Sequence, residues 1–166
     1  MRLVVLSDDF TGALDTGVQF AGTGVETVVT TLHADGSLPA AQRCTVLVVD
    51  TESRHLTAEA AGARVRDTVL RIRHGIGVDA QAELPGDPRI LWYKKTDSLL
   101  RGNIGSELAA LMDAAGGGEL AFVPAFPATG RTTTGGVQYL DGVPIDRTPF
   151  APDQLNPIRS ARVPFY

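Results

Sequence analysis

Two adjacent carboxylates, with a hydroxyl close behind them, are the first residues of the chain whose types suit chemistry. Asp8-Asp9-Phe10-Thr11-Gly12 comes directly after a short apolar run. Aspartate and threonine at the start of a helix often satisfy its free N–H groups, and capping of this kind accounts for one of them. Neighbouring residues in a turn usually point in different directions. We therefore expect Asp8 or Asp9 to cap the helix while the other faces a ligand, in a catalytic or binding role.

A second cluster combines cations with hydroxyl and carboxylate groups. Lys94-Lys95-Thr96-Asp97-Ser98 is followed by Arg101 and Asn103. Arginine can hold a carboxylate through two parallel hydrogen bonds, and free N–H groups at a helix start add to such a site. The same residues fit a solvated turn before a helix capped by Ser98 or Asn103, but the three cations favour an anion site. The candidate contacts are Lys95, Asp97, Ser98 and Arg101.

Two further segments carry weaker signals. Asp50-Thr51-Glu52-Ser53-Arg54 follows another apolar run, and for Asp50 and Arg54 a structural role and a ligand contact are equally good interpretations. The glycine- and threonine-rich segment 130–136 could cradle a phosphate through backbone N–H groups, but it is also typical of a hairpin turn. It is not a P-loop, since no lysine follows its G-x-x-x-x-G frame. Arg131 is the residue of this segment that we select as a ligand contact.

Short apolar runs alternate with segments of helical periodicity, and these elements must position the clusters. The predicted strands are Arg2–Leu6, Val25–Leu32, Thr45–Val49, Ile90–Tyr93 and Leu120–Val123. The alternation predicts an α/β fold, a mainly parallel sheet with helices on both faces in a Rossmann-like three-layer arrangement. Because parallel strands end at one edge of a sheet, the polar segments that follow them should line one cleft.

Three helices are predicted from the spacing of apolar residues. One helix face carries Phe10, Leu14, Val18 and Ala21; a second, capped by Thr57, carries Ala61, Val65, Val69 and Ile72; a core stripe of the third runs from Ile104 to Ala115. Residues 75–89 read as a loop. The segment after Pro124 is rich in proline and glycine and predicts a β-hairpin of Arg131–Thr134 and Val137–Leu140, with extended chain or linker from Phe150 onward.

The composition argues against several classes of protein. The chain has 166 residues, 43% hydrophobic and 20% charged, which is typical of a folded globular domain. A net charge of −4 argues against nucleic-acid and anionic-membrane partners, which select clustered positive charge. Cys44 is the only cysteine, and the three histidines lack metal-ligand spacing, so no metal site is predicted. With no signal peptide and no apolar run of about 20 residues, we expect a cytoplasmic protein.

The ordered set of motifs resembles the N-terminal substrate-binding domain of the four-carbon acid sugar kinase family. The segment 8–13 with Asp15 is similar to the opening signature of that family, and the segment 95–103 is similar to its central one. The third signature is resembled by Pro124-Ala125-Phe126-Pro127, Gly130-Arg131, Gly135-Gly136, Tyr139 and Asp141-Gly142, and the tail by Asp153 with Asn156-Pro157. The matches span nearly the whole chain, and the set is specific although no single motif is decisive.

The resemblance implies ATP-dependent phosphorylation of a four-carbon sugar acid, of the threonate, erythronate or 3-oxo-tetronate type, on its terminal hydroxyl. It implies that ATP and Mg²⁺ bind mainly to a second, C-terminal nucleotide-binding domain. Residues 1–166 are then expected to be a C-terminally truncated substrate-binding domain that does not transfer phosphate alone.

Phosphoryl transfer also suggests roles for the selected residues, because it needs charge neutralisation and a base for the attacking hydroxyl. The candidates for the substrate carboxylate and the incoming phosphate are Lys95, Arg101 and Arg131. The candidates for hydroxyl recognition are Asp8, Asp9 and Asp97, and either of the first two could take the hydroxyl proton.

Three alternatives remain open at this point. A haloacid-dehalogenase-like phosphatase also places aspartates after its first strand, but it needs them separated by one residue, whereas Asp8 and Asp9 are adjacent. A non-catalytic module that binds small acids is the second alternative. The third is an assembly fragment in which a homo-oligomer covers an exposed apolar patch.

Overall fold

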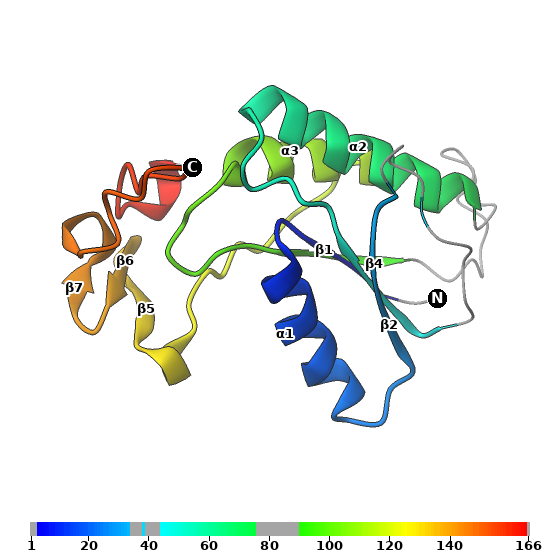
Figure 1. Ribbon diagram of the computed structural model, residues 1–166, viewed down its shortest axis with the longest axis horizontal. Helices are drawn as coiled ribbons and strands as arrows, with labels where there is room; N and C mark the ends of the chain where they lie inside the picture. The colour runs from blue at the N-terminus through cyan, green and yellow to red at the C-terminus, as the bar shows by residue number, and fades with distance from the viewer. Residues whose placement is uncertain (1–2, 34–37, 39–43, 76–89, 166) are drawn as a thin grey trace.

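Four short strands form a fully parallel sheet in the computed structural model, which describes residues 3–33, 38, 44–75 and 90–165 (Figure 1). The strands are β1 (Leu3–Ser7), β2 (Thr27–Thr31), β3 (Val46–Asp50) and β4 (Leu91–Lys95). Their order across the sheet is β2-β3-β1-β4. Each predicted strand in this set is confirmed to within two residues at either end. The sheet with helices on both faces confirms the predicted α/β fold.

The register of the sheet brings the carboxyl ends of three strands into line. Ser7, the last residue of β1, pairs with Asp50 of β3 on one side and with Lys95 of β4 on the other. The segments that leave these strands therefore begin side by side at one edge of the sheet.

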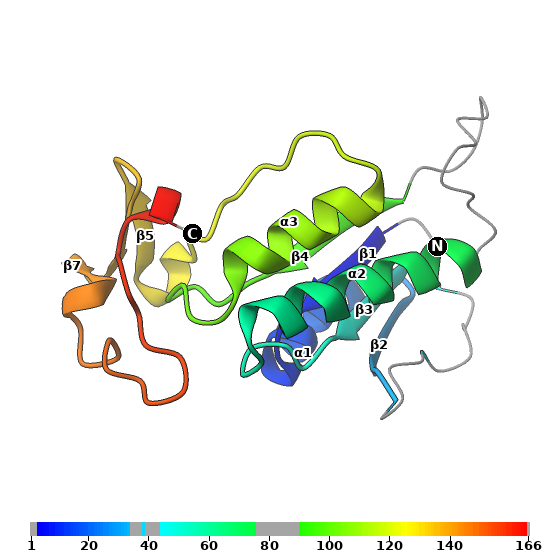
Figure 2. The same ribbon diagram turned by 90° about the horizontal axis from the view of Figure 1, so that it is seen from above.

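One face of the sheet is covered by two long helices, α2 (Ala58–Gly75) and α3 (Ile104–Ala115), which lie next to each other across the strands (Figure 2). Val65 and Val69 of α2 are fully buried and pack with Leu111 of α3 and the strand valines. The N–H of Ala60 donates to Thr57 Oγ1 at 3.2 Å, so Thr57 caps α2 as predicted. The apolar stripe of this helix is confirmed as core.

Among the helices that the structure describes, α1 (Phe10–Ala21) covers the opposite face (Figure 1). The residues of α1 that are buried are small: Gly12, Ala13 and Gly17. A Cβ atom at Gly17 would overlap Val29 Cγ2, so glycine permits the close approach of helix and strand. The helix is therefore confirmed, but its apolar face of large residues points away from the sheet.

The predicted fifth strand, Leu120–Val123, is wrong. The segment contributes no strand to either sheet and carries the chain from α3 to the smaller lobe (Figure 2). Leu120 packs at the edge of the main core and Phe122 at the edge of a second core, while Val123 is exposed. Apolar and β-branched residues favour extended backbone here, but a strand also requires a partner for its hydrogen bonds.

The smaller lobe is built on a hairpin of β5 (Arg131–Thr134) and β6 (Val137–Leu140), both with the predicted bounds. The structure adds β7 (Val143–Pro144) and three 3₁₀ turns: η1 (Pro127–Thr129), η2 (Ile145–Arg147) and η3 (Val163–Phe165). A second core joins the lobes, because Leu100 and Ile104 of the larger lobe pack with Ile145 and Ile158.

The segment from Phe150 onward is packed and is not a free linker. Ile158 and Ala161 are buried, and the Gln138 N–H donates to the Ala161 carbonyl at 2.8 Å. The loop predicted for 75–89 lies outside the described residues except for Gly75, the last residue of α2. Among the described helices, none has the length and apolar character needed to cross a bilayer.

Candidate functional site

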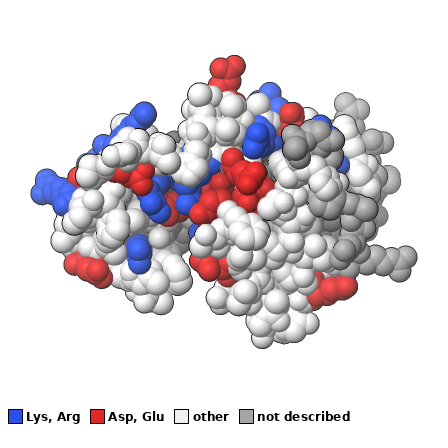
Figure 3. Space-filling model, in the orientation of Figure 1, with Lys and Arg blue, Asp and Glu red and all other residues white. Residues whose placement is uncertain are grey.

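Charged side chains gather at the edge of the sheet where β1, β3 and β4 end. On the face of the molecule shown in Figure 3, acidic and basic side chains meet at the centre, between the larger and smaller lobes. Because α/β sheets bind ligands outside the carboxyl ends of their strands, this edge is the candidate site. As predicted, the segments after β1, β3 and β4 begin at this one edge.

Asp8, Asp9 and Arg54 form one hydrogen-bonded group, which we call the Asp8–Arg54 cluster. Arg54 donates from Nε and Nη2 to the two oxygens of Asp8, at 2.8 and 3.1 Å, and from Nη1 to Asp9 Oδ2 at 2.6 Å. The side chains of Arg54 and Asp8 are 11% and 4% exposed, against 26% for Asp9. Burial works to lower the pKa of Arg54, but the hydrogen bonds and charge of Asp8, with Asp9, raise it above its ordinary value.

The structure shows which of the two aspartates caps the helix. Asp9 Oδ1 accepts from the Gly12 N–H at 2.9 Å and caps α1, so Asp9 holds the helix with one oxygen and Arg54 with the other. Asp8 makes no cap and is buried against Arg54. Arg54 is thus the residue that joins the segments after β1 and β3.

Asp50 lies behind this cluster as a fully buried carboxylate. Its Oδ1 accepts from the Glu52 N–H at 2.9 Å, whereas Oδ2 has no hydrogen-bond partner among the described residues. Burial is the main cause that raises the pKa of Asp50, and the negative charges of Glu52, Asp9 and Asp8 act in the same direction. Asp50 is therefore part of the floor of the site and is not at its surface.

The segment after β4 forms a second ion pair. Arg101 donates to Asp97 from Nε at 2.6 Å and from Nη2 at 3.2 Å, and its Nη1 lies 3.6 Å from Asp153 Oδ2. Burial works to raise the pKa of Asp97, but the hydrogen bonds and charge of Arg101, together with the charge of Arg54, hold it below its ordinary value. The two ion pairs are therefore close enough to interact.

The other two candidates of this segment, Lys95 and Ser98, hydrogen-bond to nearby parts of the chain. Lys95 Nζ donates to the Thr96 carbonyl at 2.9 Å, and lies close to the start of α1, 3.4 Å from where a Cβ of Gly12 would be. The backbone carbonyl of Ser98 accepts from Gln138 Nε2 at 2.8 Å, which ties the loop to the hairpin.

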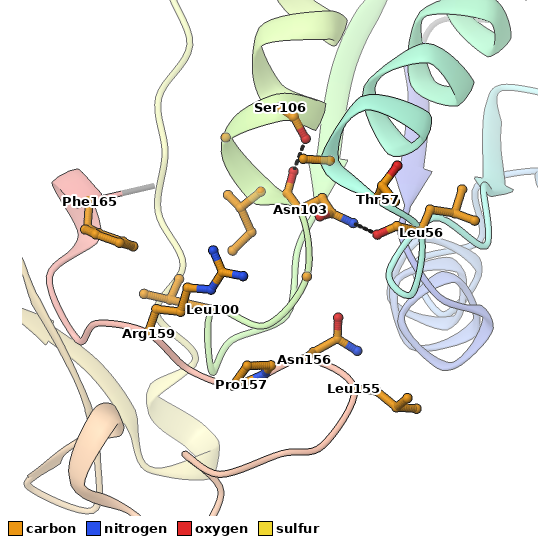
Figure 4. A pocket seen from close by; sticks show the side chains of 14 residues that line it. Leu56, Thr57, Leu100, Asn103, Ser106, Leu155, Asn156, Pro157, Arg159 and Phe165 are labelled. Atoms are coloured by element: carbon orange, nitrogen blue, oxygen red, sulfur yellow. Dashed lines mark hydrogen bonds between the residues drawn. The ribbon is translucent and has the colours of Figure 1, made fainter.

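A cleft of about 420 Å³ opens beside the Asp8–Arg54 cluster (Figure 4). It lies between the first turns of α2 and α3 and the segment that contains Asn156 and Arg159. Asn103 starts α3 without capping it, because its amide donates instead to the Leu56, Ser53 and Arg54 carbonyls, at 2.9, 3.2 and 3.4 Å. The cleft has the size of a small-molecule site.

Gly102 is the point at which the cleft and the cluster meet. It lines the cleft, and a Cβ placed on it would lie 3.3 Å from Asp8 Oδ2 and 3.4 Å from Arg54 Cγ. Its φ of +91° is unfavourable for any other residue. A larger residue here would separate the cleft from the ion pair.

Arg131 does not join the other candidates, and this departs from the sequence expectation. It lies in the hairpin, where its Nη1 donates to the Thr129 carbonyl at 2.7 Å, and no described ion pair or hydrogen bond connects it to the Asp8–Arg54 cluster. The expectation relied on a fifth strand that does not form. Gly135 and Gly136 have φ values of +57° and +75° and make the hairpin turn, as the structural interpretation of this segment predicted.

Two further features were missed from the sequence. Lys94 Nζ and Glu107 Oε2 form an ion pair of 2.7 Å with side chains 1% and 2% exposed, which joins β4 to α3 beneath the site. Arg159 reaches into the cleft from the segment that was expected to be extended chain or linker (Figure 4). The only available signal for Arg159 was its proximity in sequence to Asn156-Pro157.

Comparisons with known proteins cover almost the whole chain. Residues 3–166 match the family model described as sugar-binding N-terminal domain. The D-threonate kinase of Salmonella typhimurium is 39% identical over 98% of this chain and 35% of its own length, and the D-erythronate kinase of Heliobacterium modesticaldum is 35% identical over 98% and 34%. The chain thus spans about a third of the length of these curated relatives.

A solved structure from Bordetella bronchiseptica shares the fold. It is described as a domain of unknown function with bound citrate, in a domain-swapped dimer. It is 36% identical, with a TM-score of 0.82, and the match covers 99% of this chain and 39% of that one.

Proposed function

The chain belongs to the family of sugar-binding N-terminal domains, and we propose that it is the substrate-binding part of an ATP-dependent kinase for four-carbon sugar acids. The substrate is of the threonate, erythronate or 3-oxo-tetronate type, and phosphate is transferred to its terminal hydroxyl. The kinases that match this chain over nearly its full length support the proposal. We expect phosphoryl transfer to require a nucleotide-binding domain in addition to these residues.

The observation that carries the proposal is the junction of the cleft and the Asp8–Arg54 cluster at Gly102. A sugar acid has a carboxylate at one end and a hydroxyl at the other, so its site must offer cations and carboxylates within one molecule's length. Arg159 supplies a cation in the cleft, and Arg101 has an Nη1 group that makes no hydrogen bond within the described residues. Asp8 and Asp9 supply carboxylates at the other side of Gly102.

Accessibility favours Asp9 over Asp8 as the group that takes the hydroxyl proton. Both oxygens of each carboxylate accept a hydrogen bond, but the side chain of Asp9 is 26% exposed and that of Asp8 only 4%. A base must come within hydrogen-bond distance of the proton it removes, or act through one water. We assign Asp8 and Arg54 to holding Asp9 in position, and Lys95 with Arg101 to binding substrate carboxylate or stabilising charge on the phosphate.

ATP with Mg²⁺ is the phosphate donor in this proposal. The residues described here contain no group of three or more His, Cys, Asp or Glu side chains arranged to hold a metal ion. Because Mg²⁺ beside a nucleotide is usually held by one or two carboxylates together with the phosphates, this absence does not locate the ion. We assign ATP and Mg²⁺ mainly to the nucleotide-binding domain on the family relationship. The phosphatase alternative is not carried forward, because Asp8 is bound on both oxygens by Arg54 and is adjacent to Asp9.

Titration calorimetry with D-threonate, D-erythronate and 3-oxo-tetronate tests the location of the site. We expect one acid to bind, and Arg101→Ala to weaken that binding by about tenfold or more, since a hydrogen bond to a charged group contributes about 1.5–3 kcal/mol. Arg66→Ala is the matched control, because Arg66 is exposed on α2 and makes only a long pair of 3.9 Å with Asp113. Equal binding by both variants and the native chain would contradict the assigned site.

A non-catalytic acid-binding module is distinguished from a kinase part by a second assay. A kinase part should be unable to consume ATP alone, and should support turnover of the acid that it binds once it is joined to the nucleotide-binding domain of a relative. Binding of an acid without turnover in that fusion would favour the binding module. ATP-dependent turnover by residues 1–166 alone would contradict the proposal that phosphoryl transfer requires a nucleotide-binding domain.

A further inference from the structure

The turn after β3 contains a residue in an unusual backbone conformation. Glu52 has a φ of +47°, in the left-handed region that residues other than glycine seldom adopt. Among the described residues, Leu100 and Asp141 are the other two non-glycine residues with positive φ, and Leu100 lies in the segment after β4. Two of these three residues therefore belong to segments that border the candidate site. Backbone strain of this kind persists only where the surrounding structure enforces it, and it is concentrated at functional sites.

The carboxylate of Asp50 holds this turn. Asp50 is fully buried, so any effect it has on a ligand must act through other residues. Its Oδ1 accepts from the Glu52 N–H at 2.9 Å, while Oδ2 has no partner among the described residues. A buried carboxylate with so few hydrogen bonds costs stability, so stability alone does not account for Asp50. An aspartate that accepts from the N–H two residues further on fixes the conformation of a turn.

The turn joins two anchored parts of the chain. Before the turn, the N–H and Oγ1 of Thr51 donate to the Ser7 carbonyl at 2.9 and 2.7 Å. After the turn, the Arg54 N–H donates to the Asp8 carbonyl at 3.1 Å. Glu52 lies between these anchors and is exposed, so its conformation determines where the chain delivers Arg54.

We propose that Asp50 is a positioning residue, which sets the guanidinium of Arg54 through the backbone of Glu52. The guanidinium in turn holds Asp9, to which removal of the hydroxyl proton is assigned above, so the inference rests on the proposed function. Asparagine offers the same acceptor oxygen and should replace Asp50, whereas alanine should not. Glycine at position 52 adopts a positive φ without help, and should make Asp50 dispensable.

NMR spectroscopy of the 166-residue chain tests the inference without a ligand. The Arg54 Nε–H signal, identified by its loss in Arg54→Lys, should exchange slowly with water because it donates to the buried carboxylate of Asp8. Asp50→Ala should speed this exchange by about tenfold or more, and Asp50→Asn should leave it slow. Asp113→Ala is the matched control, since the side chain of Asp113 is 74% exposed on α3.

A double variant separates positioning from a general loss of folding. Asp50→Ala/Glu52→Gly should fold and regain slow exchange at Arg54, because glycine adopts the left-handed conformation unaided. A residue that only filled the floor of the site would not be rescued by a change at another position. Slow exchange in Asp50→Ala would overturn the inference, as would fast exchange or unfolding in the double variant.

Titration calorimetry with D-threonate, D-erythronate and 3-oxo-tetronate connects this geometry to the proposed function. Asp50→Ala should weaken the binding of the acid that the native chain binds by about tenfold, and the double variant should restore it. Unchanged binding in Asp50→Ala would contradict a role of Asp50 in the site. If the native chain bound none of the acids, the proposed function would be contradicted, and the exchange measurement would still decide whether Asp50 positions Arg54.

Discussion

The two faces of the sheet are covered in different ways. On one face, α2 and α3 bury branched side chains such as Val65, Val69 and Leu111 in a thick core, with the Lys94–Glu107 ion pair beneath them. On the other face, the fully buried residues of α1 are small, Phe20 packs at the edge of the core, and Phe10, Leu14 and Val18 are exposed. The first face is built for stability within the chain. On the second face, Gly17 lets α1 approach the sheet closely.

The largest effect on the free energy of unfolding is expected at the buried Lys94–Glu107 ion pair, on the face covered by α2 and α3. Lys94→Met leaves the Glu107 carboxylate buried without its partner, which should lower the free energy of unfolding by about 3–5 kcal/mol. The double variant Lys94→Met/Glu107→Leu should recover most of this loss, because no charge then remains buried. Urea denaturation of both variants measures the difference. A single variant as stable as the native chain would show that the pair contributes nothing to this face.

Two valines on the two helices give the most direct comparison. Val69→Ala removes fully buried methyl groups from α2 and should lower the free energy of unfolding by about 2 kcal/mol. Val18→Ala makes the same change on the exposed face of α1 and should alter the free energy of unfolding by less than about 0.5 kcal/mol. Similar losses for both variants would mean that Val18 is part of the core.

Two glycines compare a tightly packed position on α1 with an open position at the end of α2. Gly17→Ala would push a methyl group against Val29 and should cost about 1–3 kcal/mol of unfolding free energy, as overpacking usually does. Gly75→Ala has open space at the end of α2 and should instead stabilise the chain by about 0.4–1 kcal/mol. Thermal and urea unfolding give both values, and a stabilising Gly17→Ala would rule out the close packing of α1 on β2.

The smallest effect on the free energy of unfolding is expected at Asp97, in the segment that follows β4. The pKa of Asp97 lies below its ordinary value, so the stabilisation from its pair with Arg101 is complete above the unfolded-state pKa and is lost as pH falls through the lower folded-state pKa. Asp97→Asn should therefore be less stable than the native chain at neutral pH, and the gap should narrow as the solution is acidified below about pH 4. A gap that stays constant with pH would exclude this ion pair as its source.

The contrast also explains how much could be predicted from the sequence. Periodicity predicted α1 and α2 equally well, but it cannot tell which side of a helix faces the sheet, because small residues such as Gly17 give no hydrophobic signal. Leu120–Val123 has the composition of a strand, yet pairing depends on an available partner, which local sequence does not encode. Lys94 was grouped with Lys95 and Arg101 as cations of an anion site, since nothing near it in sequence indicates that Glu107 lies opposite.

The residues of the candidate site also include some that the sequence located and some that it did not. Asp8, Asp9, Arg54, Asp97 and Arg101 were all selected because they follow strands of a parallel sheet, and the structure brings them to one edge. Arg131 was selected because it follows a predicted fifth strand, which does not form, and no described hydrogen bond or ion pair joins Arg131 to the others. Arg159 enters the cleft only through the path of the packed C-terminal segment, and long-range packing of that kind leaves no local pattern.

Thermal denaturation of the purified chain with each four-carbon sugar acid, and separately with Mg-ATP, tests the central claim most directly. A ligand that binds only the folded state stabilises it by mass action, by about 2.7 kcal/mol at a hundredfold excess over its dissociation constant. A substrate-binding part of a sugar acid kinase should be stabilised by one sugar acid and not by Mg-ATP. Stabilisation by Mg-ATP alone, or by none of these compounds at concentrations well above those of a working substrate, would contradict the account.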